Sequence, residues 1–121
     1  MHELSLAGGV LRLVEDAAAR ERFTRVSQLR LEAGALAGVE VRALRFALST
    51  LTPGTVLAGA DILIDEPPGT AWCLGCNSSV PIRSRLDDCP SCGSARLQPT
   101  SGTELRVVDL LVHDDPAPAT P

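Results

Sequence analysis

Aromatic side chains are almost absent from this chain, which has two phenylalanines, one tryptophan and no tyrosine among 121 residues. It also lacks positive charge in excess, because its formal net charge at pH 7 is −4. Proteins that bind nucleic acids need a cationic field for the phosphates and, for single strands, aromatic surfaces on which bases stack. The composition therefore argues against a nucleic-acid partner.

The start of the chain lacks the features of a secretory signal. No basic segment precedes Leu4, and Arg12, Glu15 and Asp16 interrupt any apolar run that follows. No uncharged stretch of the sequence approaches transmembrane length. We therefore expect a cytoplasmic protein with no membrane partner, in which cysteines stay reduced and favour metal binding over disulfides.

All the cysteines lie in one short segment, as the two pairs Cys73-x2-Cys76 and Cys89-x2-Cys92. Two CxxC pairs at this separation have the spacing of a four-thiolate zinc site. Four thiolates fill the tetrahedral shell of Zn²⁺ and leave no position for water or substrate. The spacing therefore predicts a structural zinc with no enzyme activity at this site, so the chain's chemistry is expected elsewhere. A redox role for either pair alone is the competing interpretation.

Hydrophobic periodicity divides the rest of the chain into helices and strands. Helices are predicted over 4–19 and 39–51, and half-buried strands over 26–33, 60–66 and 104–112. The last two strands flank the cysteines, so the cysteine segment reads as an insertion. The predicted fold class is α+β, a small α/β domain of two helices on a roughly three-stranded sheet with an inserted four-cysteine zinc module.

This order predicts three parts of the chain. Residues 1–69 plus 99–112 form the α/β domain, 70–98 form the zinc module, and 113–121 form a disordered tail of Asp, Pro, Ala and Thr. A segment of about 30 residues has too small a core to fold unaided, so the metal should hold the module together.

His2 is a second candidate for chemistry because of its position. The α-amine of Met1, the amide nitrogen of His2 and its imidazole can close two small chelate rings around one ion, and such nitrogen donors suit Ni²⁺ or Cu²⁺. Glu3 could add an amide nitrogen or a carboxylate oxygen, or could stabilise the start of the first helix through the macrodipole. On spacing alone, however, a single histidine near a terminus is more often a solvated side chain.

His113 and Trp72 each adjoin residues that can bind a metal. His113 adjoins Asp114 and Asp115, but a flexible tail would have to be ordered to bring them onto an ion. Trp72 directly precedes Cys73, and we expect it to pack against the zinc turn.

Several separated motifs resemble one known family. They are Met1-His2-Glu3-Leu4-Ser5, Gly38-Val39-Glu40 followed by Ala43-Leu44-Arg45-Phe46-Ala47, the two cysteine pairs with Pro90-Ser91 and Gly93-Ser94, and Ser101-Gly102-x-Glu104-Leu105-Arg106-Val107. In this order they resemble the hydrogenase-maturation nickel metallochaperones of the HypA type over residues 1–112. Asn77 departs from the pattern, since members commonly have glycine there, although asparagine also tolerates a left-handed turn.

The resemblance implies a function and a set of ligands. It implies Ni²⁺ bound at the N-terminus through His2, with Glu3 adjoining, and Zn²⁺ bound by the four cysteines. It also implies delivery of nickel to the large subunit of nickel–iron hydrogenase together with a nickel-binding GTPase, and some members also serve urease maturation.

Three other functions are compatible with parts of this sequence. A zinc-ribbon module for protein or nucleic-acid interaction shares the four cysteines, but the acidic charge and the lack of aromatics argue against nucleic acid. A zinc hydrolase needs an open metal position and a general base, and neither histidine pairs with a partial cysteine site. A plain interaction module would bind one zinc and no specific nickel.

Overall fold

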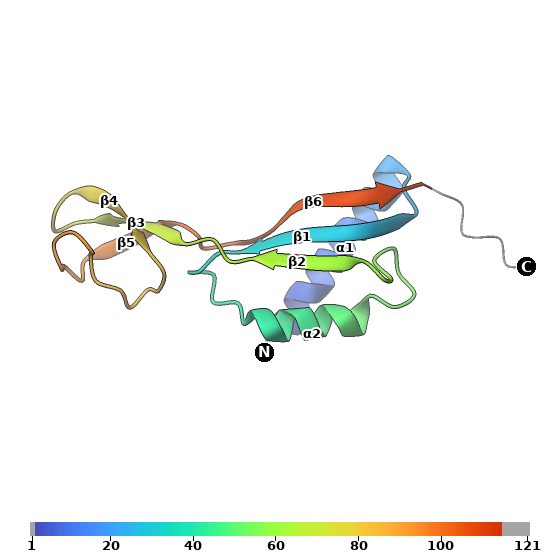
Figure 1. Cartoon of the computed structure of the whole chain (residues 1–121), viewed down its shortest axis with the longest axis horizontal. Helices are drawn as coiled ribbons and strands as arrows, with labels where there is room; N and C mark the ends of the chain where they lie inside the picture. The colour runs from blue at the N-terminus through green and yellow to red at the C-terminus, as the bar shows by residue number, and fades with distance from the viewer. Residues whose placement is uncertain (1, 115–121) are drawn as a thin grey trace, which may run out of the picture. The chain divides into compact units, whose positions relative to one another are not determined.

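The computed structural model describes residues 2–114, which form two compact units (Figure 1). Unit 1 comprises the described residues of 1–31, 40–63 and 107–121, and unit 2 comprises 32–39 and 64–106. Both helices lie in unit 1, and each unit has a three-stranded sheet. Neither helix has the length and apolar character that crossing a bilayer requires. The two helices and small sheets confirm the predicted α+β class.

The first helix, α1 (Glu3–Glu21), is amphipathic. Its buried residues are Ala7, Val10, Val14 and Ala17, whose spacing of three and four places them on one face. The helix ends at Arg22, which adopts a left-handed conformation with φ of 61°. α1 thus confirms the helix predicted over 4–19 and extends it slightly at both ends.

The second helix, α2 (Val41–Leu51), begins after Glu40. Glu40 is the N-cap: its backbone is extended, and its carboxylate accepts a hydrogen bond of 2.9 Å from the amide of Arg42. Leu44, Ala47 and Leu48 form the buried face, and α2 packs against α1. The helix starts later than the predicted Val39 because the capping carboxylate fixes its first turn.

The sheet of unit 1 has the order β2-β1-β6, with β1 (Arg25–Ala33) between β2 (Asp61–Asp65) and β6 (Leu105–His113). β1 buries alternate residues toward its end, including Leu29 and Leu31, as the predicted half-buried strand requires. α1 passes behind this sheet in the view of Figure 1. β6 extends through His113, which the sequence assigned to the tail, and residues 115–121 lie outside the described part.

The sheet of unit 2 consists of β3 (Gly69–Cys73), β4 (Ser78–Ile82) and β5 (Leu97–Ser101), in the antiparallel order β4-β3-β5. The sequence did not predict these strands, because each has only five residues and proline interrupts two of them. Pro81 and Pro99 are accommodated because β4 and β5 are edge strands, where a missing backbone donor is tolerated.

Unit 2 includes more of the chain than the module predicted over 70–98. Its core consists of Leu36, Ala71, Cys73, Val80, Ile82 and Cys89. Leu36 comes from the 32–39 segment, and its amide donates to the Gly102 carbonyl at 2.8 Å. Gly34 lies so close to Gly102 that a Cβ at position 34 would collide with the Gly102 carbonyl oxygen. Leu36 therefore packs into a core whose other members all come from the inserted module.

Candidate metal centres

The four cysteines are brought together by two turns of unit 2. Cys73 ends β3 and Cys76 lies in the turn that follows, while Cys89 and Cys92 lie in the turn before β5. Their Sγ atoms all lie within 4.8 Å of one another, and this is the only such group of potential ligands within residues 2–114. Cys73 and Cys89 are buried, whereas Cys76 and Cys92 are exposed.

The two cysteine turns have the same backbone design. In the first, the amide of Asn77 donates to the Cys73 carbonyl at 2.8 Å, and in the second the amide of Gly93 donates to the Cys89 carbonyl at 2.8 Å. Asn77 and Gly93 occupy equivalent places and are both left-handed, with φ of 53° and 78°. The asparagine noted in the sequence therefore adopts the conformation that glycine would supply.

The sulfur separations fit a tetrahedral ion. Sulfurs that surround Zn²⁺ tetrahedrally at about 2.3 Å lie about 3.8 Å apart. The Sγ atoms of Cys73 and Cys92 are 3.6 Å apart, and those of Cys76 and Cys89 are 3.8 Å apart. A disulfide would require about 2.05 Å. The arrangement thus suits a closed four-thiolate metal site and excludes a pair of disulfides.

The pKa values of the cysteine thiols also indicate that the cluster suits a bound cation. Burial raises the pKa of the Cys89 thiol, but the amides of Cys92 and Ser91, each 3.4 Å from its Sγ, stabilise the thiolate and lower the pKa to about 6. At Cys92 a hydrogen bond from the Ser94 amide lowers the pKa, but the Cys73 thiol, burial and the Cys89 and Cys76 thiols together raise it to about 12. Four thiolates can therefore coexist only around a positive ion, which would displace the remaining protons.

The other candidate centre lies at the start of α1. His2 is the N-cap residue, and its carbonyl accepts the first helical hydrogen bond, from the Leu6 amide at 2.8 Å. Its imidazole is exposed and makes no capping hydrogen bond. Because the amide of His2 precedes the helix, its deprotonation would break no hydrogen bond of the helix itself. Met1, whose amine completes the expected chelate, lies outside the described residues.

Glu3 is tied to the start of the second helix. Its Oε2 accepts a hydrogen bond of 3.1 Å from the amide of Glu40, the N-cap residue of α2. This hydrogen bond is the main reason why the pKa of the Glu3 carboxyl lies below its ordinary value. The contact is therefore present above the ordinary carboxyl pKa and is lost only as the pH falls through the lowered value. The sequence analysis did not assign Glu40 as a helix cap, because the predicted helix began at Val39 and so included it.

The remaining candidates do not join either centre. His113 lies at the end of β6 with Nε2 2.9 Å from Ser27 Oγ, and Asp115 of its expected cluster lies outside the described residues. Trp72 is 40% exposed and alternates with buried Ala71 and Cys73, so it lies on the opposite face of β3 from the sulfurs. The expected packing of Trp72 on the zinc turn is therefore wrong, because side chains alternate across a strand.

Known proteins resemble this chain over almost its whole length. The sequence profile of a family described as hydrogenase/urease nickel incorporation, metallochaperone, hypA, matches residues 1–112. The hydrogenase maturation factor HypA of Cupriavidus necator is 66% identical over 94% of this chain and 96% of its own length. That of Polaromonas naphthalenivorans is 61% identical over 95% of this chain and 100% of its own length.

A solved structure shares the fold. The solution structure of the Ni metallochaperone HypA from Helicobacter pylori has a TM-score of 0.70 and covers 95% of this chain and 100% of its own. Its sequence identity is only 20%, so it supports the arrangement of helices and sheets alone.

Proposed function

Since the chain belongs to the HypA family of nickel metallochaperones, we propose that it carries Ni²⁺ on its N-terminus, through His2, during hydrogenase maturation. Membership makes the chain a maturation factor, and we expect it to turn over no substrate of its own. The observation that carries the proposed site is the exposed His2 side chain at the start of a helix, free of any capping role.

The proposed nickel ligands are nitrogen atoms. The Met1 amine, the amide and imidazole of His2, and the amide of Glu3 would surround Ni²⁺ with donors that suit a tetragonal field. A deprotonated amide carries negative charge, which the positive end of the α1 macrodipole stabilises. Because every donor competes with protons, nickel affinity should fall as the pH drops. Contact with a recipient protein would lower the affinity by rearranging the same donors.

The second metal in the proposal is a structural Zn²⁺ held by Cys73, Cys76, Cys89 and Cys92. Its chemistry is to supply folding energy to unit 2. A closed tetrahedral set of thiolates is a poor site for the transferable ion, so we assign nickel to unit 1 and zinc to unit 2. Reduced thiols agree with a cytoplasmic location.

We propose three kinds of protein partner. A nickel-binding GTPase would work with the chain, the large subunit of nickel–iron hydrogenase would receive the ion, and urease maturation proteins are further candidates. The direct test is to incubate the chain, loaded with one equivalent of ⁶³Ni, with purified nickel-free large-subunit precursor and to count the label on each protein. Transfer faster than from free nickel buffered at the same concentration would support delivery, and equal rates would reject it.

The hydrogen bond between Glu3 and Glu40 yields a prediction about the role of Glu3. We expect Glu3→Gln to keep nickel affinity within about threefold, because the amide oxygen of glutamine also accepts a hydrogen bond. Glu3→Ala should weaken nickel binding more than Glu3→Gln, because the first turn of α1 loses its anchor. Calorimetry with NiCl₂ on both variants measures this, and an equal, large loss in both would instead make the carboxylate a direct ligand.

A further inference from the structure

The outer face of α2, formed by Arg42, Arg45, Phe46 and Ser49, serves neither the core nor a metal centre. These residues follow the spacing i, i+3, i+4 and i+7, which places them on one side of the helix, and all four are exposed. In the sequence motif that runs from residue 43 to 47, Leu44 and Ala47 are buried and contribute to the core. The core does not explain the exposed Phe46.

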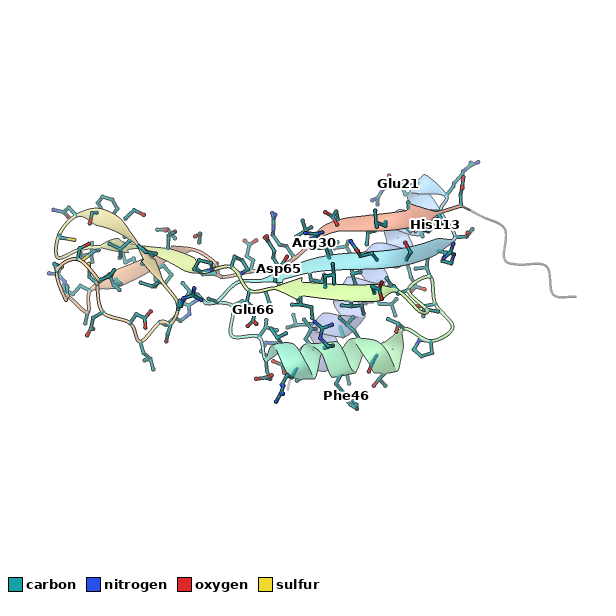
Figure 2. The ribbon with its side chains drawn as sticks, in the orientation of Figure 1. Glu21, Arg30, Phe46, Asp65, Glu66 and His113 are labelled. Atoms are coloured by element: carbon teal, nitrogen blue, oxygen red, sulfur yellow. The ribbon has the colours of Figure 1, made fainter. Side chains whose placement is uncertain are left out.

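Phe46 is the most conspicuous residue of this face. It is 73% exposed, whereas the only other phenylalanine, Phe23, is 9% exposed. Figure 2 shows Phe46 projecting from α2 on the side away from the sheet of unit 1. Phenylalanine and arginine are enriched at protein interfaces, and a single aromatic anchor often contributes most of the binding energy.

The charge of α2 differs from that of the chain. Residues 41–51 contain two arginines and no acidic residue, although the net charge of the whole chain is −4. Arg45 is held in place because its Nη1 donates to the Ile62 carbonyl at 2.7 Å. Beside it, a hollow of about 580 Å³ lined partly by Arg45, Ser49 and Leu63 leaves room for a side chain of a partner.

This face lies close to the proposed nickel terminus. Glu3 is hydrogen-bonded to the amide of Glu40. Phe46 is six residues after Glu40, which is about 9 Å along the axis of α2. A typical interface covers about 800 Å² of each protein, equivalent to a disc of about 16 Å radius. A protein that contacts His2 to take its ion is therefore large enough to reach Phe46 as well.

We propose that the outer face of α2 docks the protein that receives nickel, and that the recipient offers an apolar pocket rimmed by carboxylates. This inference rests on the proposed function, since it identifies the surface used at the same site. A second copy of the chain fits less well, because a two-fold interface on this face would bring Arg42 and Arg45 against their own copies.

The test uses the full-length, zinc-loaded protein and the purified nickel-free large-subunit precursor, with binding followed by surface plasmon resonance. We expect Phe46→Ala to weaken binding about 30-fold, as for a central anchor. Arg42→Glu should slow association, most strongly at low salt. The matched controls are Arg20→Glu, about 27 Å along α1 from His2, and Leu111→Ala near the end of β6, where Leu111 is 54% exposed, and neither should change binding.

Nickel calorimetry on the same variants separates the two hypotheses. We expect unchanged nickel affinity in Phe46→Ala and Arg42→Glu, since neither residue is a proposed ligand. The docking surface is overturned if the parent binds the precursor and both variants bind it equally well, or if the variants change only self-association in sedimentation. If the parent binds nickel but not the precursor, the proposed function fails, and the docking surface fails with it.

Discussion

Replacing Cys73 with serine should unfold unit 2 while α1 and α2 persist. Cys73 is fully buried among the few residues of the unit 2 core, and its sulfur lies 3.6 Å from that of Cys92. Structural zinc contributes apparent binding energies of about 10–16 kcal/mol, and a core of this size cannot replace them. Unit 1 has its own core, built on residues such as Val14, Leu29 and Leu48, and should remain folded.

Two spectroscopic signals report separately on the folding of unit 1 and unit 2. Trp72, the only tryptophan, lies in unit 2, and the chain has no tyrosine, so its emission follows that unit alone. Both helices lie in unit 1, so ellipticity at 222 nm follows unit 1. In Cys73→Ser, as in chelated parent protein, Trp72 emission should shift to the red while helical ellipticity stays near its original value.

The matched control is Ser91→Ala, which alters an exposed non-ligand in the second cysteine turn. It should retain one zinc and the native emission, because only the backbone amide of Ser91 contacts Cys89. Acid should act like chelation, because the protons that zinc displaces from the thiols return as the pH falls. Simultaneous loss of both signals would contradict the division into two independently folded units.

Replacing His2 with alanine should abolish specific nickel binding and leave zinc in place. The imidazole is a proposed direct ligand. Replacing even a residue that only orients a ligand lowers metal affinity about 10–100-fold. We therefore expect a loss of more than about 100-fold, measured by calorimetry with NiCl₂. An N-terminal tag should have a similar effect, because it removes the free amine of Met1 from the chelate.

His113→Ala is the control for this experiment. His113 is the only other histidine and is hydrogen-bonded to Ser27, so its removal should not change nickel affinity. Native mass spectrometry should find one zinc and one nickel in this control, and one zinc alone in His2→Ala. Nickel that remains bound to His2→Ala with sulfur-to-metal absorption bands would instead place the transferable ion on the cysteines.

The sequence predicted those elements whose side chains repeat over a long segment. α1 and α2 were predicted because their buried residues recur at helical spacing, and β1 because its end alternates. The three strands of unit 2 were missed, since five residues with a proline carry almost no periodic signal. The extent of unit 2 was also missed, because nothing local in the sequence assigns Leu36 to a core built more than thirty residues later.

The candidate centres differ in how well they could be predicted. The cysteine cluster follows from spacing, because each CxxC turn is local and only their meeting depends on the fold. The contact between Glu3 and Glu40 joins the starts of two helices, and such a tertiary contact leaves no trace in a single sequence. The exposure of Phe46 was not predicted either, although Phe46 lies outside the helical spacing that Leu44 and Leu48 follow.

The matching turns around Cys73 and Cys89 have a consequence for how this protein can evolve. The backbone is left-handed at positions 77 and 93, a conformation that L-amino acids with a Cβ generally disfavour. Neither position is a metal ligand, so this conformation is the constraint on its side chain. Asparagine and glycine can therefore replace one another there by mutational drift without any effect on the sulfur chemistry. A β-branched residue at either place would be selected against even though all four thiols were intact.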